Sequence, residues 1–118
     1  MCIRDRFIIQ IESILAVKNL EEILQVKGID AVMVGPYDLS ASMNITGLFE
    51  NKKYHLALEQ IKKTCLSFNV PFGYHITEAN KGITKKIISQ GYQFIAYCTD
   101  GIILTCLLYT SPSPRDNR

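Results

Sequence analysis

Apolar residues along this chain fall into short continuous runs that alternate with segments of helical spacing. The runs FIIQIES, IDAVMVG, VPFGYHI and YQFIAYCTD are typical of strands that are buried on both faces, because such strands show little alternation of apolar and polar residues. The first run begins at Phe7 and ends at Glu12, and the others cover residues 29–35, 70–76 and 92–100. The pattern therefore predicts four strands.

Between these runs, apolar residues recur at intervals of three and four, which is the spacing of an amphipathic helix. A first helix is predicted between Ser13, which can cap its start, and Gly28, which is a natural helix stop. A second is predicted from Tyr54 to Phe68, and a third over residues 78–91. The residues expected to face inward from the third helix are Ile83, Ile87 and Ile88.

The two ends of the chain differ in composition from its middle. All four arginines lie at the ends, whereas residues 7–104 contain nine lysines and nine acidic residues. MCIRDR at residues 1–6 and CLLYTSPSPRDNR at residues 106–118 resemble translations of one transposon-type sequencing adapter read in its two orientations. We expect both ends to be non-native, which leaves a partial domain over residues 7–105. A disordered C-terminal tail is the alternative for SPSPRDNR.

Strands and helices that alternate in this way predict an α/β fold of parallel strands with right-handed crossovers. Four strands form either a small open sheet or half of a (β/α)₈ barrel, which needs about 250 residues when complete. With both ends taken as cut points, the half barrel is favoured. Residues 36–53, PYDLSASMNITGLFENKK, are expected to be a polar loop.

Charge and cysteine content exclude several classes of function. The net charge of +2 arises from the ends, so the neutral middle gives no indication of a nucleic acid or an anionic membrane as partner. No apolar run approaches the roughly 20 residues of a membrane span, and the start is not a secretion signal. Cys65 and Cys98 are too widely spaced for a zinc site or a disulfide scaffold, so a reducing cytoplasm is the default location.

Two carboxylates carry the candidate chemistry. Glu12 ends the first strand and Asp38 follows the second, 26 residues later (38 − 12 = 26). Neighbouring parallel strands end at the same rim, so the two side chains are expected to stand together at a barrel mouth. One can be protonated, both can point apart into water, or a cation such as Mg²⁺ or Mn²⁺ can neutralise them. Gly35-Pro36 lets the backbone approach a ligand closely, and the amides of Tyr37 and Asp38 can face an anion.

Other polar residues at the strand ends have simpler interpretations. His75 ends the third strand, where a structural role is favoured over substrate contact. Asp100 ends the fourth strand, where capping or solvation is favoured over support of a metal site. Cys98 is expected to be a small buried residue, and His55 is expected to be solvated on its helix.

Segments around both carboxylates resemble a known family. They are QIES at Gln10–Ser13 and KGIDAVMVGPYDLSASM at Lys27–Met43, supported by GYHI at Gly73–Ile76 and GYQFIAYCTD at Gly91–Asp100. Together they are similar to the C-terminal part of the HpcH/HpaI aldolases, a family of pyruvate-dependent class II aldolases. The pattern Q-x-E followed by G-P-x-D-L-S is specific as a pair, whereas either half alone is weak.

The resemblance implies a (β/α)₈ barrel that reversibly cleaves 4-hydroxy-2-oxo acids to pyruvate and an aldehyde. It implies that Glu12 and Asp38 hold a divalent metal, either Mg²⁺ or Mn²⁺ with Co²⁺ as a further candidate, which stabilises an enolate as a Lewis acid. The complete enzyme is expected to be a homo-oligomer. The residues matching the family's substrate-binding pattern are Gln10, Gly35, Pro36, Tyr37 and Asp38.

The same resemblance implies limits on what this chain can do alone. The family's catalytic histidine and substrate-binding arginine belong to the N-terminal half of the barrel, so we expect no catalytic residue here and no activity from the chain by itself. Asn44 stands where glycine is common in the family. Two alternatives stay open: a carbon–carbon lyase acting on a coenzyme A thioester, as the citrate lyase β-chain does, and a metal-binding half barrel without chemistry.

Overall fold

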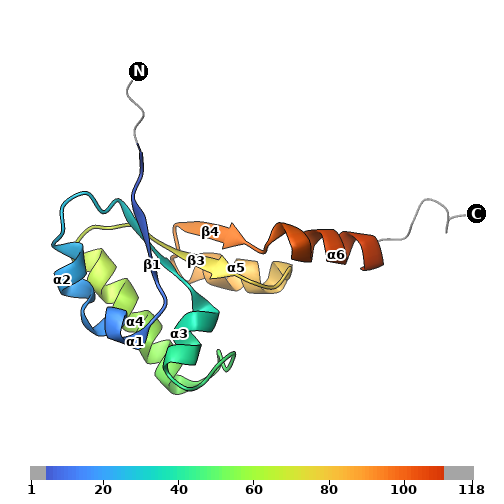
Figure 1. Cartoon of the computed structure of the whole chain (residues 1–118), viewed down its shortest axis with the longest axis horizontal. Helices are drawn as coiled ribbons and strands as arrows, with labels where there is room; N and C mark the ends of the chain where they lie inside the picture. The colour runs from blue at the N-terminus through green and yellow to red at the C-terminus, as the bar shows by residue number, and fades with distance from the viewer. Residues whose placement is uncertain (1–4, 111–118) are drawn as a thin grey trace, which may run out of the picture.

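The structure, a computed structural model, describes residues 5–110 of the chain. Its centre is a parallel sheet with the strand order β1-β2-β3-β4 (Figure 1). The strands are Ile8–Ile11 (β1), Ala31–Val34 (β2), Phe72–Ile76 (β3) and Phe94–Tyr97 (β4). The predicted α/β fold with four parallel strands is confirmed, and each strand lies within the run that predicted it.

Helices connect and follow the strands, as parallel strands require. They are α1 (Ile14–Lys18) and α2 (Leu20–Leu24) after β1, α3 (Pro36–Ser42) and α4 (Lys52–Ser67) after β2, α5 (Lys81–Ser89) after β3, and α6 (Asp100–Thr110) after β4. In Figure 1, α6 projects sideways from the end of β4, away from the other helices.

The core lies on the face of the sheet that packs against the helices. Its members come from alternate strand positions and from one side of each helix, and none of those named here is more than 7% exposed: Ile11, Val32, Val34, Tyr74, Leu20, Leu39, Tyr54 and Ile61. The other face of the sheet, here called the open face, is uncovered over β1, where Ile8 is 49% exposed. By strand alternation its residues are Ile8, Gln10, Met33, Gly73, His75, Phe94 and Ala96.

A short helix, α3, replaces the predicted polar loop directly after β2. Pro36 occupies its first position, where the missing amide hydrogen of proline costs nothing. The apolar side chain of Leu39 is fully buried, and the Ser40 hydroxyl donates to the carbonyl oxygen of Tyr37 at 2.8 Å. The loop prediction was wrong over these residues because one buried leucine in a polar stretch gives no visible period. Residues 43–51 form the remaining loop.

Three smaller predictions were also wrong. The helix expected between Ser13 and Gly28 is two helices, because the chain turns at Asn19 (φ −96°, ψ 10°). Ile88 is 58% exposed, whereas Ile87 is buried. The fourth strand ends at Tyr97, and Asp100 instead begins α6.

Local polar contacts fix the helix ends. The Ser13 hydroxyl accepts a hydrogen bond of 3.1 Å from the amide of Ala16, which confirms the predicted cap. After α3 and α4 the chain passes through positive φ at Asn44 (58°) and Asn69 (54°). Asparagine tolerates this left-handed conformation better than most residues other than glycine, which explains why Asn44 can stand where glycine is common.

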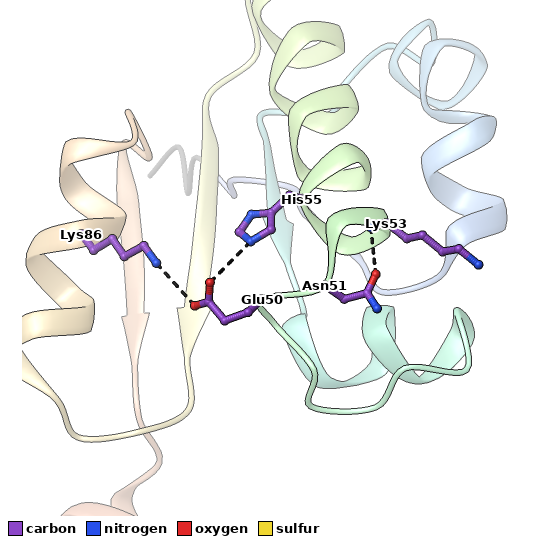
Figure 2. Close-up of polar contacts among 5 residues, drawn as sticks. All are labelled: Glu50, Asn51, Lys53, His55 and Lys86. Atoms are coloured by element: carbon purple, nitrogen blue, oxygen red, sulfur yellow. Dashed lines mark hydrogen bonds and ion pairs between the residues drawn. The ribbon is translucent and has the colours of Figure 1, made fainter.

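An acidic side chain bridges α4 and α5 on the outer surface. Figure 2 shows Glu50 between His55 of α4, at 3.9 Å, and Lys86 of α5, at 3.6 Å. Beside it, the Asn51 side chain caps α4 by accepting from the amide of Lys53 at 2.9 Å. His55 thus lies beside Glu50 while its side chain remains 44% exposed.

Candidate functional site

Three of the predicted site residues meet at the carboxyl end of β1 and β2. The amide of Gly35 donates to the carbonyl oxygen of Ile11 at 3.0 Å, which extends the strand pairing one residue beyond β2 and places Gly35 beside Glu12. A methyl group built on Gly35 would lie 2.6 Å from Gln10 Nε2 and 3.4 Å from Glu12 Oε2. The side chains of Gln10 and Glu12 therefore lean over the bare backbone of Gly35.

Glycine at position 35 is needed for space and not for conformation. Its φ of −96° is open to any residue. The cradle over Gly35 is bounded by the amide of Gln10 and the carboxylate of Glu12, and any larger residue would fill it. Close approach of a ligand to the backbone of Gly35, which the sequence analysis expects, stays a prediction.

Asp38 lies in the first turn of α3, three residues after Gly35. The first helical hydrogen bond of α3 runs from the amide of Leu39 to the carbonyl oxygen of Gly35, at 3.0 Å. The amides of Tyr37 and Asp38 precede it, so they have no partner within the helix. Fold and register thus bring Glu12 and Asp38 to the same end of adjacent strands.

The loop after α3 is braced against its first turn. Tyr37, 42% exposed, packs edge-on against Phe49 with ring centroids 5.1 Å apart. The buried Ser40 hydroxyl accepts from the amide of Gly47 at 3.0 Å. The sequence analysis missed both Ser40 and Phe49. The one signal in the sequence for Ser40 is that it follows the candidate site residue Asp38 by two positions.

The residues at this rim fit a divalent metal in their donor chemistry. Both carboxylates are exposed, and within the part of the chain that the structure describes neither forms an ion pair. No group of three or more metal-binding side chains occurs among the described residues. A metal held here would therefore rely on Glu12 and Asp38 together with oxygen atoms from substrate or water, as Mg²⁺ and Mn²⁺ accept.

The remaining candidates, His75, Cys98 and Asp100, lie at or after the carboxyl ends of β3 and β4. His75 is the last residue of β3 on the open face, one position before the strand ends at Ile76, and its Nε2 is 3.4 Å from the carbonyl oxygen of Cys98. Cys98 is 8% exposed, as expected of a small buried residue, and adopts a positive φ of 56°. A cavity of about 90 Å³ at this end has Pro36, Phe49, His75 and Glu78 among its lining residues. The Asp100 carboxylate accepts a hydrogen bond of 2.8 Å from the amide of Gly101 in the first turn of α6.

Glu12 and Asp38 follow the carboxyl ends of adjacent parallel strands, which is the end of the sheet where barrel enzymes place their sites. The sequence profile of the HpcH/HpaI aldolase/citrate lyase family matches residues 4–105. The chain belongs to this family. Among the described residues, every helix is too short or too polar to cross a membrane.

Individual relatives that the chain resembles are aldolases. The chain is 36% identical over 105 residues to a 4-hydroxy-2-oxo-heptane-1,7-dioate aldolase of Escherichia coli, covering 88% of this chain and 37% of the relative. It is 31% identical over 107 residues to a 2-keto-3-deoxy-L-rhamnonate aldolase of Salmonella paratyphi B, covering 83% and 36%. The chain thus spans little more than a third of these relatives.

A solved structure supports the architecture. The HpcH/HpaI aldolase of Desulfitobacterium hafniense superposes with a TM-score of 0.80 at 28% identity, over 89% of this chain and 40% of that one. Four strands in consecutive order, matching about two fifths of a larger relative, confirm the predicted half barrel.

Proposed function

We propose that this chain carries the metal-binding half of an aldolase site, which in the complete enzyme cleaves a 4-hydroxy-2-oxo acid to pyruvate and an aldehyde. The observation that carries the proposal is the cradle over Gly35, where Glu12 and Gln10 border a space that glycine keeps free. The aldolase names of the relatives support this reaction class over the coenzyme A lyase and the non-catalytic half barrel.

In this proposal Glu12 and Asp38 hold a divalent metal, Mg²⁺ or Mn²⁺. The metal supplies Lewis acidity to the oxo acid when bound. Two carboxylates at one rim repel each other, and this repulsion favours a shared cation. Because no third side-chain ligand is available among the described residues, open positions are left for oxygen atoms of the oxo acid.

The neighbouring residues bind and orient the substrate. The amides of Tyr37 and Asp38, which have no helical partner, donate to the substrate carboxylate. The side-chain amide of Gln10 donates to an oxygen atom over Gly35, and Pro36 fixes the start of α3 so that these amides are preorganised. Each group acts by holding the oxo acid flat over Gly35.

Retro-aldol turnover by the complete enzyme that contains this segment tests the proposal. Glu12→Gln and Asp38→Asn should each abolish most activity, and a chelator should abolish wild-type activity until Mg²⁺ or Mn²⁺ is added back. Glu22→Gln, an exposed change on α2, is the matched control and should keep wild-type activity. Turnover that persists without any divalent metal, or in Glu12→Gln, contradicts the proposal.

A further inference from the structure

His75 lies in the same row of side chains as Glu12, on the open face of the sheet. Phe72, Tyr74 and Ile76 belong to the core on the helical side, so the intervening His75 points the other way. Val34 pairs with both Ile11 and Tyr74, and one residue further along this register Gly35 stands between Glu12 and His75.

The residue between Glu12 and His75 in this row is a glycine, and the atoms that lie over it belong to the side chains of Gln10 and Glu12. Adjacent strands lie about 4.8 Å apart, so the Cα atoms of Glu12 and His75 are about 10 Å apart across Gly35. A five-carbon oxo acid whose carboxylate end is held near Glu12 extends over Gly35 and ends near His75. In this register His75 is the next residue after Gly35 on the side away from Glu12.

The hydrogen bond of His75 to the backbone determines which ring nitrogen is free. Its Nε2 lies 3.4 Å from the carbonyl oxygen of Cys98, which can only accept, so Nε2 donates. In a neutral imidazole the other nitrogen, Nδ1, is then an acceptor. In the described part of the chain Nδ1 takes part in no hydrogen bond. The Nδ1 atom of His75 is therefore an unused hydrogen-bond acceptor, and it would bind a substrate group that can donate a hydrogen bond, such as a hydroxyl.

We propose that His75 is a specificity-determining residue, whose Nδ1 accepts a hydrogen bond from a hydroxyl group on carbon 5 of the substrate. The enzyme then prefers a hydroxylated aldehyde to an alkyl aldehyde. This inference rests on the proposed function, because it requires the oxo-acid end to bind at Glu12 and Asp38.

The chain contains only two histidines, which allows a direct test with the full 118-residue protein labelled with ¹⁵N-histidine. The probes are Mg²⁺ with 2,5-dihydroxypentanoate and Mg²⁺ with 2-hydroxypentanoate, which differ only in the 5-hydroxyl. The Nδ1 resonance of His75 should shift with the first and not with the second. His55, which lies beside Glu50 on α4, is the internal control and should respond to neither.

Affinities from the same titrations provide the second measurement. The 5-hydroxyl should strengthen binding about fivefold to tenfold, as one added hydrogen bond does. This advantage should disappear in His75→Leu, while both compounds still bind in a Glu12-dependent manner. Glu12-dependent binding with no His75 shift and no affinity difference overturns the role of His75 and leaves the proposed function standing. Failure of both compounds to bind the wild-type chain overturns this inference, whereas the proposed function is tested separately by turnover of the complete enzyme.

Discussion

The amide of Gly35 donates a hydrogen bond of 3.0 Å to the carbonyl oxygen of Ile11, one residue beyond the end of β2. This bond keeps β1 and β2 paired at their carboxyl ends, where the candidate site residues lie. Glu12 therefore lies directly beside Gly35, which has no side chain. The candidate site therefore depends on backbone pairing that continues past the regular sheet. A change that fills the space over Gly35 should disturb the site without breaking this pairing.

Gly35→Ala should weaken divalent-metal binding at least tenfold while changing the free energy of unfolding by less than about 1 kcal/mol. The added methyl group would lie 2.6 Å from Gln10 Nε2, and Gln10 is an exposed, flexible side chain that can move away. Its displacement and the crowding of the Glu12 carboxylate alter the site, whereas φ at this position suits alanine. Calorimetric titration with Mn²⁺ and urea unfolding measure the two quantities.

Gly101→Ala is the matched control, because a methyl group there meets nothing within 4 Å. It should leave Mn²⁺ binding unchanged. Unaltered Mn²⁺ affinity in Gly35→Ala would show that the space over Gly35 has no part in binding.

Tyr54→Phe and Tyr92→Phe should change the free energy of unfolding in different ways, because of these two hydroxyls only that of Tyr54 has a hydrogen-bond partner in the described part of the chain. Tyr54 and Tyr74 share a buried hydrogen bond of 2.8 Å between their hydroxyls, so Tyr54→Phe leaves the Tyr74 hydroxyl unpaired and should cost about 1–3 kcal/mol of unfolding free energy. The Tyr92 hydroxyl is buried with no partner among the described residues, so Tyr92→Phe should be neutral or stabilising. Chemical denaturation checks both, and an equal loss in the two variants would contradict the assigned contacts.

Alkaline pH should destabilise the protein through Cys65. Burial raises the pKa of its thiol from the ordinary 9.0 to about 11. The unfolded chain therefore loses this proton first, and stability falls as pH rises from about 9 to about 11, by at most about 1.4 kcal/mol per pH unit. Urea unfolding at pH 8, 9 and 10 measures the slope. Cys65→Ala is less stable throughout and should show a flatter dependence between pH 9 and 10, so equal slopes would rule out this thiol as the cause.

The strands could be predicted because each is a short apolar run between turn residues, and the site carboxylates could be placed because parallel strands end at one rim. Other features could not be predicted. A helix of seven residues such as α3 shows no period, and only the structure reveals that Leu39 is buried in it. The row formed by Glu12, Gly35 and His75 depends on strand register, which no single strand encodes. The structural role expected for His75 stays a prediction, and its hydrogen bond to the carbonyl oxygen of Cys98 is compatible with it.

Mn²⁺ binding to the 118-residue chain, followed by electron paramagnetic resonance of the free ion, tests most directly whether Glu12 and Asp38 share one metal. The account predicts a single site in the wild type that is lost in both Glu12→Gln and Asp38→Asn and kept in Glu22→Gln. Wild-type binding that survives either of the first two substitutions, or no binding by the wild type, would contradict it.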